Sequence, residues 1–191
     1  SIAREINNRQ MKTPTAELVL LVDTIAGEAY SDADKLLENF PDQGLVGYMK
    51  SMIGAWVKMG RSSDANKAIQ MLSSLENRPN FRLLYQFHAA LLTDFAGMTE
   101  KALGYFDLAT EKGVQPTLRV VQGYGLYLER TGKIAQARLL YDNYLSENPG
   151  AGDFELALRR LDEGERAPML ISTAAEGVAE VLFNFASIAL R

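Results

Sequence analysis

The residues that could do chemistry are few, and their spacing does not fit the reactions they could support. The 191-residue chain has no cysteine and a single histidine, His88, with no carboxylate four positions later to complete a metal-binding helix face. Asp32, Asp34 and Glu38 occupy positions i, i+2 and i+6, which do not pair a general acid with a base. No glycine-rich phosphate loop follows a strand pattern. We therefore expect no catalytic or metal centre, no cofactor and a structural role for His88.

The composition excludes further classes of function. Apolar residues make up 47% of the chain and charged residues 23%, which predicts a folded chain with a substantial core. The formal net charge is −4, and no cluster of lysine and arginine forms the basic stripe that nucleic acid requires. The apolar runs, such as residues 18–22, are too short for a membrane span. We expect neither nucleic-acid binding nor a membrane helix.

A pattern of glycine, alanine and a large apolar residue occurs three times. Its glycines, Gly60, Gly97 and Gly132, are 37 and then 35 residues apart. Glycine tolerates the left-handed backbone at a helix end, and alanine lets two helices approach closely. Such a period predicts stacked helical hairpins. The copies are Gly60-Ala65-Ile69-Leu72, Gly97-Ala102-Phe106-Ala109 and Gly132-Ala137-Tyr141-Tyr144.

This pattern resembles the tetratricopeptide repeat, best in the copy from Leu118, which has Tyr124-Gly125, Leu128, Gly132 and a closing Pro149. The resemblance covers about residues 14–150 and implies an all-α, right-handed α-solenoid. We expect one domain, 1–191, with repeats at about 14–45, 46–82, 83–117 and 118–151 and C-terminal helices in 153–191. The wording of residues 84–89 and 40–45 also resembles long bacterial repeat proteins that often carry export signals. This favours a periplasmic or envelope-associated place over the cytoplasm, while residues 1–12 lack an apolar signal segment and leave the compartment open.

Ten helices are expected from the periodicity and the turn residues. Their approximate ranges are 14–29, 32–40, 44–59, 62–77, 80–96, 98–112, 116–131, 134–147, 153–163 and 170–190. Gly123 and Gly125 fall inside the seventh, where each glycine costs about 1 kcal/mol relative to alanine. The repeat pattern implies that Gly125 lets a neighbouring helix pack closely. Gly123 is explained either by packing or by exposing backbone to a ligand, and Trp56 is expected in the core.

In the repeat family, partners bind the concave face, which the first helices of the hairpins line. The resemblance therefore implies a groove with cationic ends and an apolar middle, which binds a peptide or protein. The apolar residues of this groove could equally pack between repeats. The implied partner-binding residues are Lys50, Lys58, Phe87, Leu91, Asp94, Phe95, Arg119, Gln122, Glu129 and Arg130, together with Gly54, Val57 and Leu126. The sequence thus predicts a non-catalytic interaction scaffold. The alternative is an oligomerisation or substrate-presenting arm of a larger enzyme or regulatory receptor.

The last expected helix is unusually apolar. Leaving four of its large side chains in water would forgo roughly 6–12 kcal/mol, so we expect this helix to be covered. It should either fold back on the hairpin near Tyr141 and Tyr144 or pair with a second copy as a homodimer. Because it resembles the opening helix of a further repeat, we also expect the natural chain to continue. The residues expected to drive self-association are Val181, Leu182, Phe183, Phe185 and Ile188.

Overall fold

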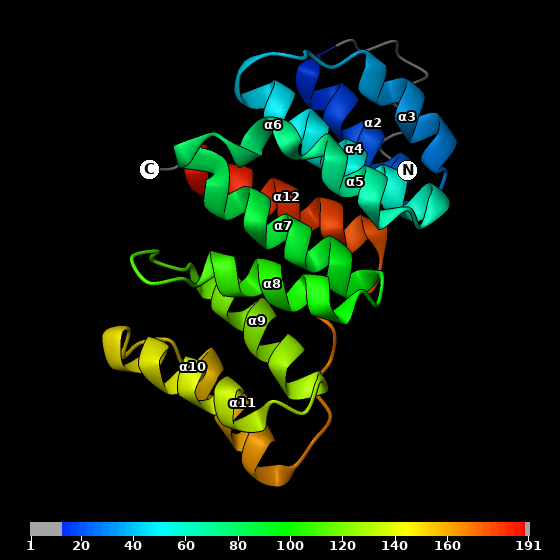
Figure 1. Ribbon diagram of the computed structural model, residues 1–191. Helices are drawn as coiled ribbons and strands as arrows, with labels where there is room; N and C mark the ends of the chain where they lie inside the picture. Colours follow the sequence, from blue (N-terminus) through cyan, green and yellow to red (C-terminus); the bar gives the residue numbers. More distant parts are fainter. Residues whose placement is uncertain (1–12, 190–191) are drawn as a thin grey trace. The chain divides into compact units, whose positions relative to one another are not determined.

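The protein is all α, as the sequence predicted (Figure 1). A computed structural model describes residues 13–189, and among these it shows eleven α-helices, one 3-10 turn and no strand. The helices are α2 (Pro14–Ala26), α3 (Tyr30–Glu38), α4 (Gly44–Ser62), α5 (Ala65–Met71), α6 (Ser73–Glu76), α7 (Arg82–Phe95), α8 (Thr99–Ala109), α9 (Leu118–Arg130), α10 (Ile134–Glu147), α11 (Asp153–Glu163) and α12 (Ala174–Ala189); the turn η1 is Pro79–Phe81.

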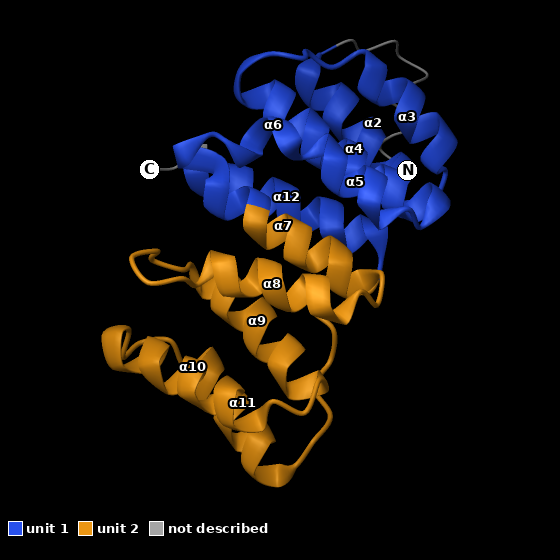
Figure 2. Ribbon diagram, in the orientation of Figure 1, with its two compact units in different colours: residues 1–85, 173–191 blue, residues 86–172 orange. Residues whose placement is uncertain are grey.

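Two compact units divide the chain, and Figure 2 colours them separately. Unit 1 contains the residues up to Tyr85 together with those from Thr173 onward, and unit 2 contains residues 86–172. The boundary falls within α7. Helix α12 therefore belongs to unit 1, together with α2 to α6.

In unit 1, consecutive helices pack as α2 on α3, α3 on α4 and α4 on α5, and α12 then packs on α4 and α2. The core of this contact is apolar: Trp56 is completely buried, and Val178 and Val181 on α12 are at most 1% exposed. The prediction that the last helix folds back near Tyr141 and Tyr144 is wrong. The ring of Phe154 from α11 already lies against both tyrosines, and α4 buries the apolar side of α12 instead.

In unit 2, α9 packs on α10 and on α8, and α10 packs on α11. The alanines of the repeated pattern in α8 and α10, Ala102 and Ala137, are fully buried. Aromatic rings fill the space beside them: Phe106 stacks on Tyr124 with ring centres 5.1 Å apart. The small-plus-large pairing read from the sequence is thus confirmed for α8, α9 and α10.

The glycines of the pattern do not all end helices. Gly97 and Gly132 have left-handed backbone, with φ of 71° and 76°, and each follows the end of its helix as predicted. Gly60 lies inside α4, and the left-handed residue after that helix is Ser63, with φ of 52°. The turn prediction at Gly60 is therefore wrong. A Cβ on Gly60 would lie 2.5 Å from Tyr30 and 2.9 Å from Ala174, so this glycine serves helix packing.

Most expected helices match the observed ones within a few residues. The exceptions are the range 62–77, which is split into α5 and α6, and the range 170–190, whose helix begins only at Ala174 because residues 170–173 are non-helical. Leu190, the end of that last range, lies outside the described residues. Between residues 13 and 189, every helix is too short or too polar to cross a lipid bilayer.

Candidate functional site

Helix α9 carries four of the predicted binding residues, Arg119, Gln122, Glu129 and Arg130, and it lies wholly in unit 2. Its start is fixed by Thr117, whose hydroxyl accepts a hydrogen bond from the amide of Val120 at 3.3 Å. One turn into the helix, the guanidinium of Arg119 donates a hydrogen bond to the side-chain oxygen of Gln122 at 2.7 Å. The candidate site is the face of α9 with the side chains that meet it from α7, α10, α11 and the segment after α11.

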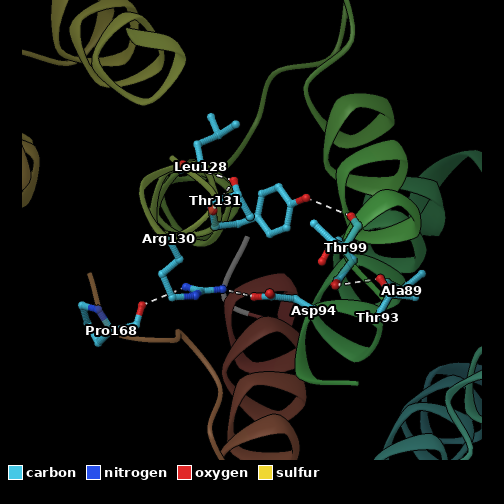
Figure 3. Close-up of polar contacts among 10 residues, drawn as sticks. Ala89, Thr93, Asp94, Thr99, Leu128, Arg130, Thr131 and Pro168 are labelled. Atoms are coloured by element: carbon cyan, nitrogen blue, oxygen red, sulfur yellow. Dashed lines mark hydrogen bonds and ion pairs between the residues drawn. The ribbon is translucent and has the colours of Figure 1, made fainter. Parts of the chain in front are cut away.

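Arg130 lies at the end of α9 and joins two separate parts of unit 2 (Figure 3). One nitrogen of its guanidinium pairs with the carboxylate of Asp94 on α7, and both side chains are only 14% exposed. Another nitrogen donates to the backbone carbonyl of Pro168 at 2.8 Å. Two predicted binding residues, Asp94 and Arg130, therefore form one ion pair, and Arg130 also holds a stretch of non-helical backbone.

That non-helical stretch, residues 165–172, lies between α11 and α12 and is called the strap below. Ala167 and Ile171 are each 4% exposed, whereas Pro168 and Met169 lie at the surface. Pro168 meets the end of α9, and Leu170 lies over Gly123 nearer its start. The strap therefore runs antiparallel to α9.

A second polar cluster is centred on Glu129, whose side chain is 2% exposed. Its carboxylate accepts two hydrogen bonds from Arg160 on α11, at 2.6 and 2.9 Å, and a third from the hydroxyl of Tyr141 on α10 at 2.6 Å. Burial, reinforced by the hydrogen bond to Glu129, raises the pKa of Tyr141 above its ordinary value. The hydrogen bond to Glu129 likewise raises the pKa of Arg160. The phenol of Tyr141 therefore stays neutral and the guanidinium of Arg160 stays charged at neutral pH.

A cavity of about 110 Å³ lies beside this cluster. Its walls combine apolar groups with four side chains that carry polar atoms, which is the usual character of a small binding pocket. The lining residues are Gln122, Leu126, Tyr141, Asp153, Phe154, Ala157, Arg160 and Pro168. Two positions that the repeat pattern places on the inner face, Gln122 and Leu126, therefore meet at one cavity, and the strap contributes its edge through Pro168.

The two glycines inside α9 are explained by close packing. A Cβ on Gly125 would lie 2.2 Å from the ring of Tyr141, so the close packing expected at this position is confirmed. A Cβ on Gly123 would lie 3.0 Å from Leu170 and 3.1 Å from Phe87. Of the two explanations that the sequence left for Gly123, packing is the one observed, and one of its neighbours is the strap.

The other predicted binding residues take different places. Phe87 and Leu91 are 1% exposed, and Leu126 is 6% exposed, so for these three the core alternative holds. Phe95 is half-buried. In unit 1, Val57 is fully buried and Lys58 is half-buried, while a Cβ on Gly54 would lie 2.8 Å from Met71. Lys50 donates to the carbonyl of Phe40 and pairs with Asp42, which closes the connection between α3 and α4.

Sequence reasoning missed Arg160, Asp153 and the strap. Arg160 lies 31 residues after Glu129, so no local pattern links the two. The only sequence signal for this part of the site is the amphipathic segment 153–163, which begins with the aromatic Phe154 and contains the basic pair Arg159 and Arg160. The strap itself reads as a polar linker that ends in an apolar run, and nothing in that run specifies which surface it covers.

Comparison with protein-family models, with curated proteins and with solved structures found no match. The part of the chain that the structure describes contains no group of three histidine, cysteine, aspartate or glutamate side chains placed to hold a metal ion. The tetratricopeptide resemblance therefore stays a prediction.

Proposed function

We propose that this protein is a non-catalytic scaffold, built from tetratricopeptide-like hairpins of an α-solenoid, that binds a peptide or protein segment on the inner faces of its first helices. The observation that carries the proposal is the cavity beside α9, since two of its walls, Gln122 and Leu126, are positions that the repeat pattern assigns to the inner face. Arg130 supports it, because its guanidinium holds a backbone carbonyl, which any peptide partner also offers.

The size of the cavity suits one aliphatic side chain of a partner. A cavity of about 150 Å³ accepts a benzene molecule when its walls are apolar, and the one here measures about 110 Å³. Leu126, Phe154 and Ala157 provide an apolar floor, while Gln122, Asp153 and Arg160 can bond the peptide groups on either side. The favoured ligand is a short peptide segment with one branched apolar residue.

A selection from a library of random peptides tests this function on the full chain. Peptides that bind should lose at least tenfold in affinity when Ala157→Leu fills the cavity, measured by fluorescence anisotropy. Two variants serve as controls and should bind as wild type: Leu156→Ala, an exposed neighbour on the same helix, and Lys67→Glu on α5. Failure to select any peptide, or selected peptides that bind Ala157→Leu as well as wild type, contradicts the proposal.

A further inference from the structure

The strap makes the contacts that a bound peptide would make. It is non-helical, it gives one backbone carbonyl to Arg130, and it places Leu170 against Gly123 while Met169 is exposed. Binding grooves hold a peptide in the same two ways, by its backbone groups and by space for single side chains. The surface of α9 under the strap is therefore already shaped for a non-helical segment with apolar side chains.

Gly123 is the feature of α9 that makes this surface possible. A glycine in a helix interior is unfavourable relative to alanine. The side chain it lacks would have to share its space with Leu170 of the strap and Phe87 of α7, at 3.0 and 3.1 Å. Helix propensity is thus given up at the position where the strap approaches. Gly125, two residues on, serves a permanent contact between α9 and α10 and so provides a comparison within the same helix.

We propose that the surface of α9 under the strap binds, in trans, an apolar peptide with a proline and, two residues later, a leucine, and that the strap is its internal competitor. The proposal rests on the proposed function and specifies its ligand: a carbonyl for Arg130, a proline at the edge of the cavity and a leucine over Gly123. The strap is held by α11 and α12 at its two ends, so its effective concentration over α9 is in the millimolar range. A partner peptide binds only when its concentration and affinity outweigh those of the strap, or when the strap is loosened.

The experiment loosens the strap in the full chain and supplies its sequence in trans. The probe is a fluorescent peptide with the sequence of residues 167–172, acetylated and amidated. Leu170→Gly removes the side chain over Gly123, and Met169→Gly is the matched control, since it adds the same backbone freedom at an exposed side chain. We expect the peptide to bind Leu170→Gly at least tenfold more tightly than it binds wild type or Met169→Gly. Thermal melting followed by circular dichroism confirms that each variant is folded.

Two further measurements identify the site. Arg130→Gln, combined with Leu170→Gly, should reduce binding of the peptide again, because the carbonyl loses its donor. Saturating peptide should also speed tryptic cleavage after Arg166, an exposed residue of the strap, since a displaced strap is open to protease. The probe itself contains neither lysine nor arginine and survives the digestion.

The outcomes separate this inference from the proposed function. The role of the strap is overturned if the probe binds wild type and Leu170→Gly equally, or if Arg130→Gln leaves the affinity for the probe unchanged. The scaffold proposal still holds in these cases if library peptides bind in a way that depends on the cavity. The same conclusion follows if library peptides bind and the probe binds no variant. If neither the probe nor any library peptide binds, both proposals fail.

Discussion

Unit 1 and unit 2, coloured separately in Figure 2, cover their helices α4 and α9 in different ways. In unit 1, a whole helix, α12, covers α4 through apolar contact so close that a Cβ on Gly177 would lie 2.1 Å from the ring of Trp56. In unit 2, the non-helical strap contacts α9 through Pro168 and Leu170, and the cavity beside α9 adjoins the ion pair of Glu129 and Arg160. Dry, tight contacts resist exchange because every neighbour must move, whereas a polar, partly open surface can accept another chain. Under the proposed function, unit 2 is therefore the half expected to bind a partner.

The largest effect should come from breaking the apolar contact of unit 1. Trp56→Ala removes the ring that meets Gly177, and we expect the free energy of unfolding to fall by about 3–5 kcal/mol. Chemical denaturation followed by circular dichroism measures this loss. Binding of peptides by unit 2 should persist wherever the variant remains folded. A loss under about 1 kcal/mol would show that α12 is not held by this contact.

A smaller effect is expected from the buried ion pair of unit 2. Glu129→Leu leaves Arg160 and the hydroxyl of Tyr141 without their shared acceptor, and should lower the free energy of unfolding by about 2–3 kcal/mol. Arg160 keeps 21% of its side chain in contact with solvent, which limits the cost.

The control for this pair is the double variant Glu129→Leu with Arg160→Met. It removes both charges together and should recover most of the lost stability, because an apolar pair can replace a buried ion pair. Denaturation of the two single variants and the double variant measures the coupling. Costs that simply add would show that the two side chains do not interact.

Acid should weaken unit 2 through His88. This side chain is fully buried, and burial lowers its pKa to about 3, whereas an unfolded chain has a histidine pKa near 6.5. The unfolded state therefore binds more protons between these two values, so stability falls as the pH drops below about 6.5. The slope from this residue approaches about 1.4 kcal/mol per pH unit. His88→Gln, which does not titrate in this range, should show a flatter pH dependence of its unfolding midpoint, and parallel curves would contradict the assignment.

The helices could be predicted from sequence because their signals are local. Ala102 and Ala137 lie where the repeated pattern put them, since a small residue five positions after a turn specifies contact with the preceding helix. The same logic misplaced the turn at Gly60. In a sequence, a glycine that ends a helix cannot be told from a glycine inside a helix that lets another residue pack closely. Only the contact with Tyr30 and Ala174 distinguishes the two.

The arrangement of the site could not be predicted, because it depends on residues far apart in the chain. The surface that α12 covers is set by Trp56 and Gly177, which are over a hundred positions apart. Glu129 and Arg130 were assigned to a partner, yet they bind Arg160 and Asp94 within their own unit. Spacing assigned Gln122 and Leu126 to one face of α9, but it could not show that Pro168 of the strap lies at the same cavity.

The smallest effect is expected at the outer side of α12, and it tests whether unit 1 also offers a surface. Val181 and Phe185 face the unit's own core, at 0% and 6% exposure, Leu182 is half-buried, and Phe183 and Ile188 are 54% and 39% exposed. Only the last two leave substantial apolar area for the homodimer expected from the sequence. Phe183→Asp should change the free energy of unfolding by less than about 0.5 kcal/mol, because surface substitutions rarely exceed that value. Light scattering coupled to size exclusion, at high protein concentration, then separates the two roles of α12: a dimer that Phe183→Asp dissociates would make unit 1 a self-association surface, whereas a monomer for both proteins would confine α12 to covering α4.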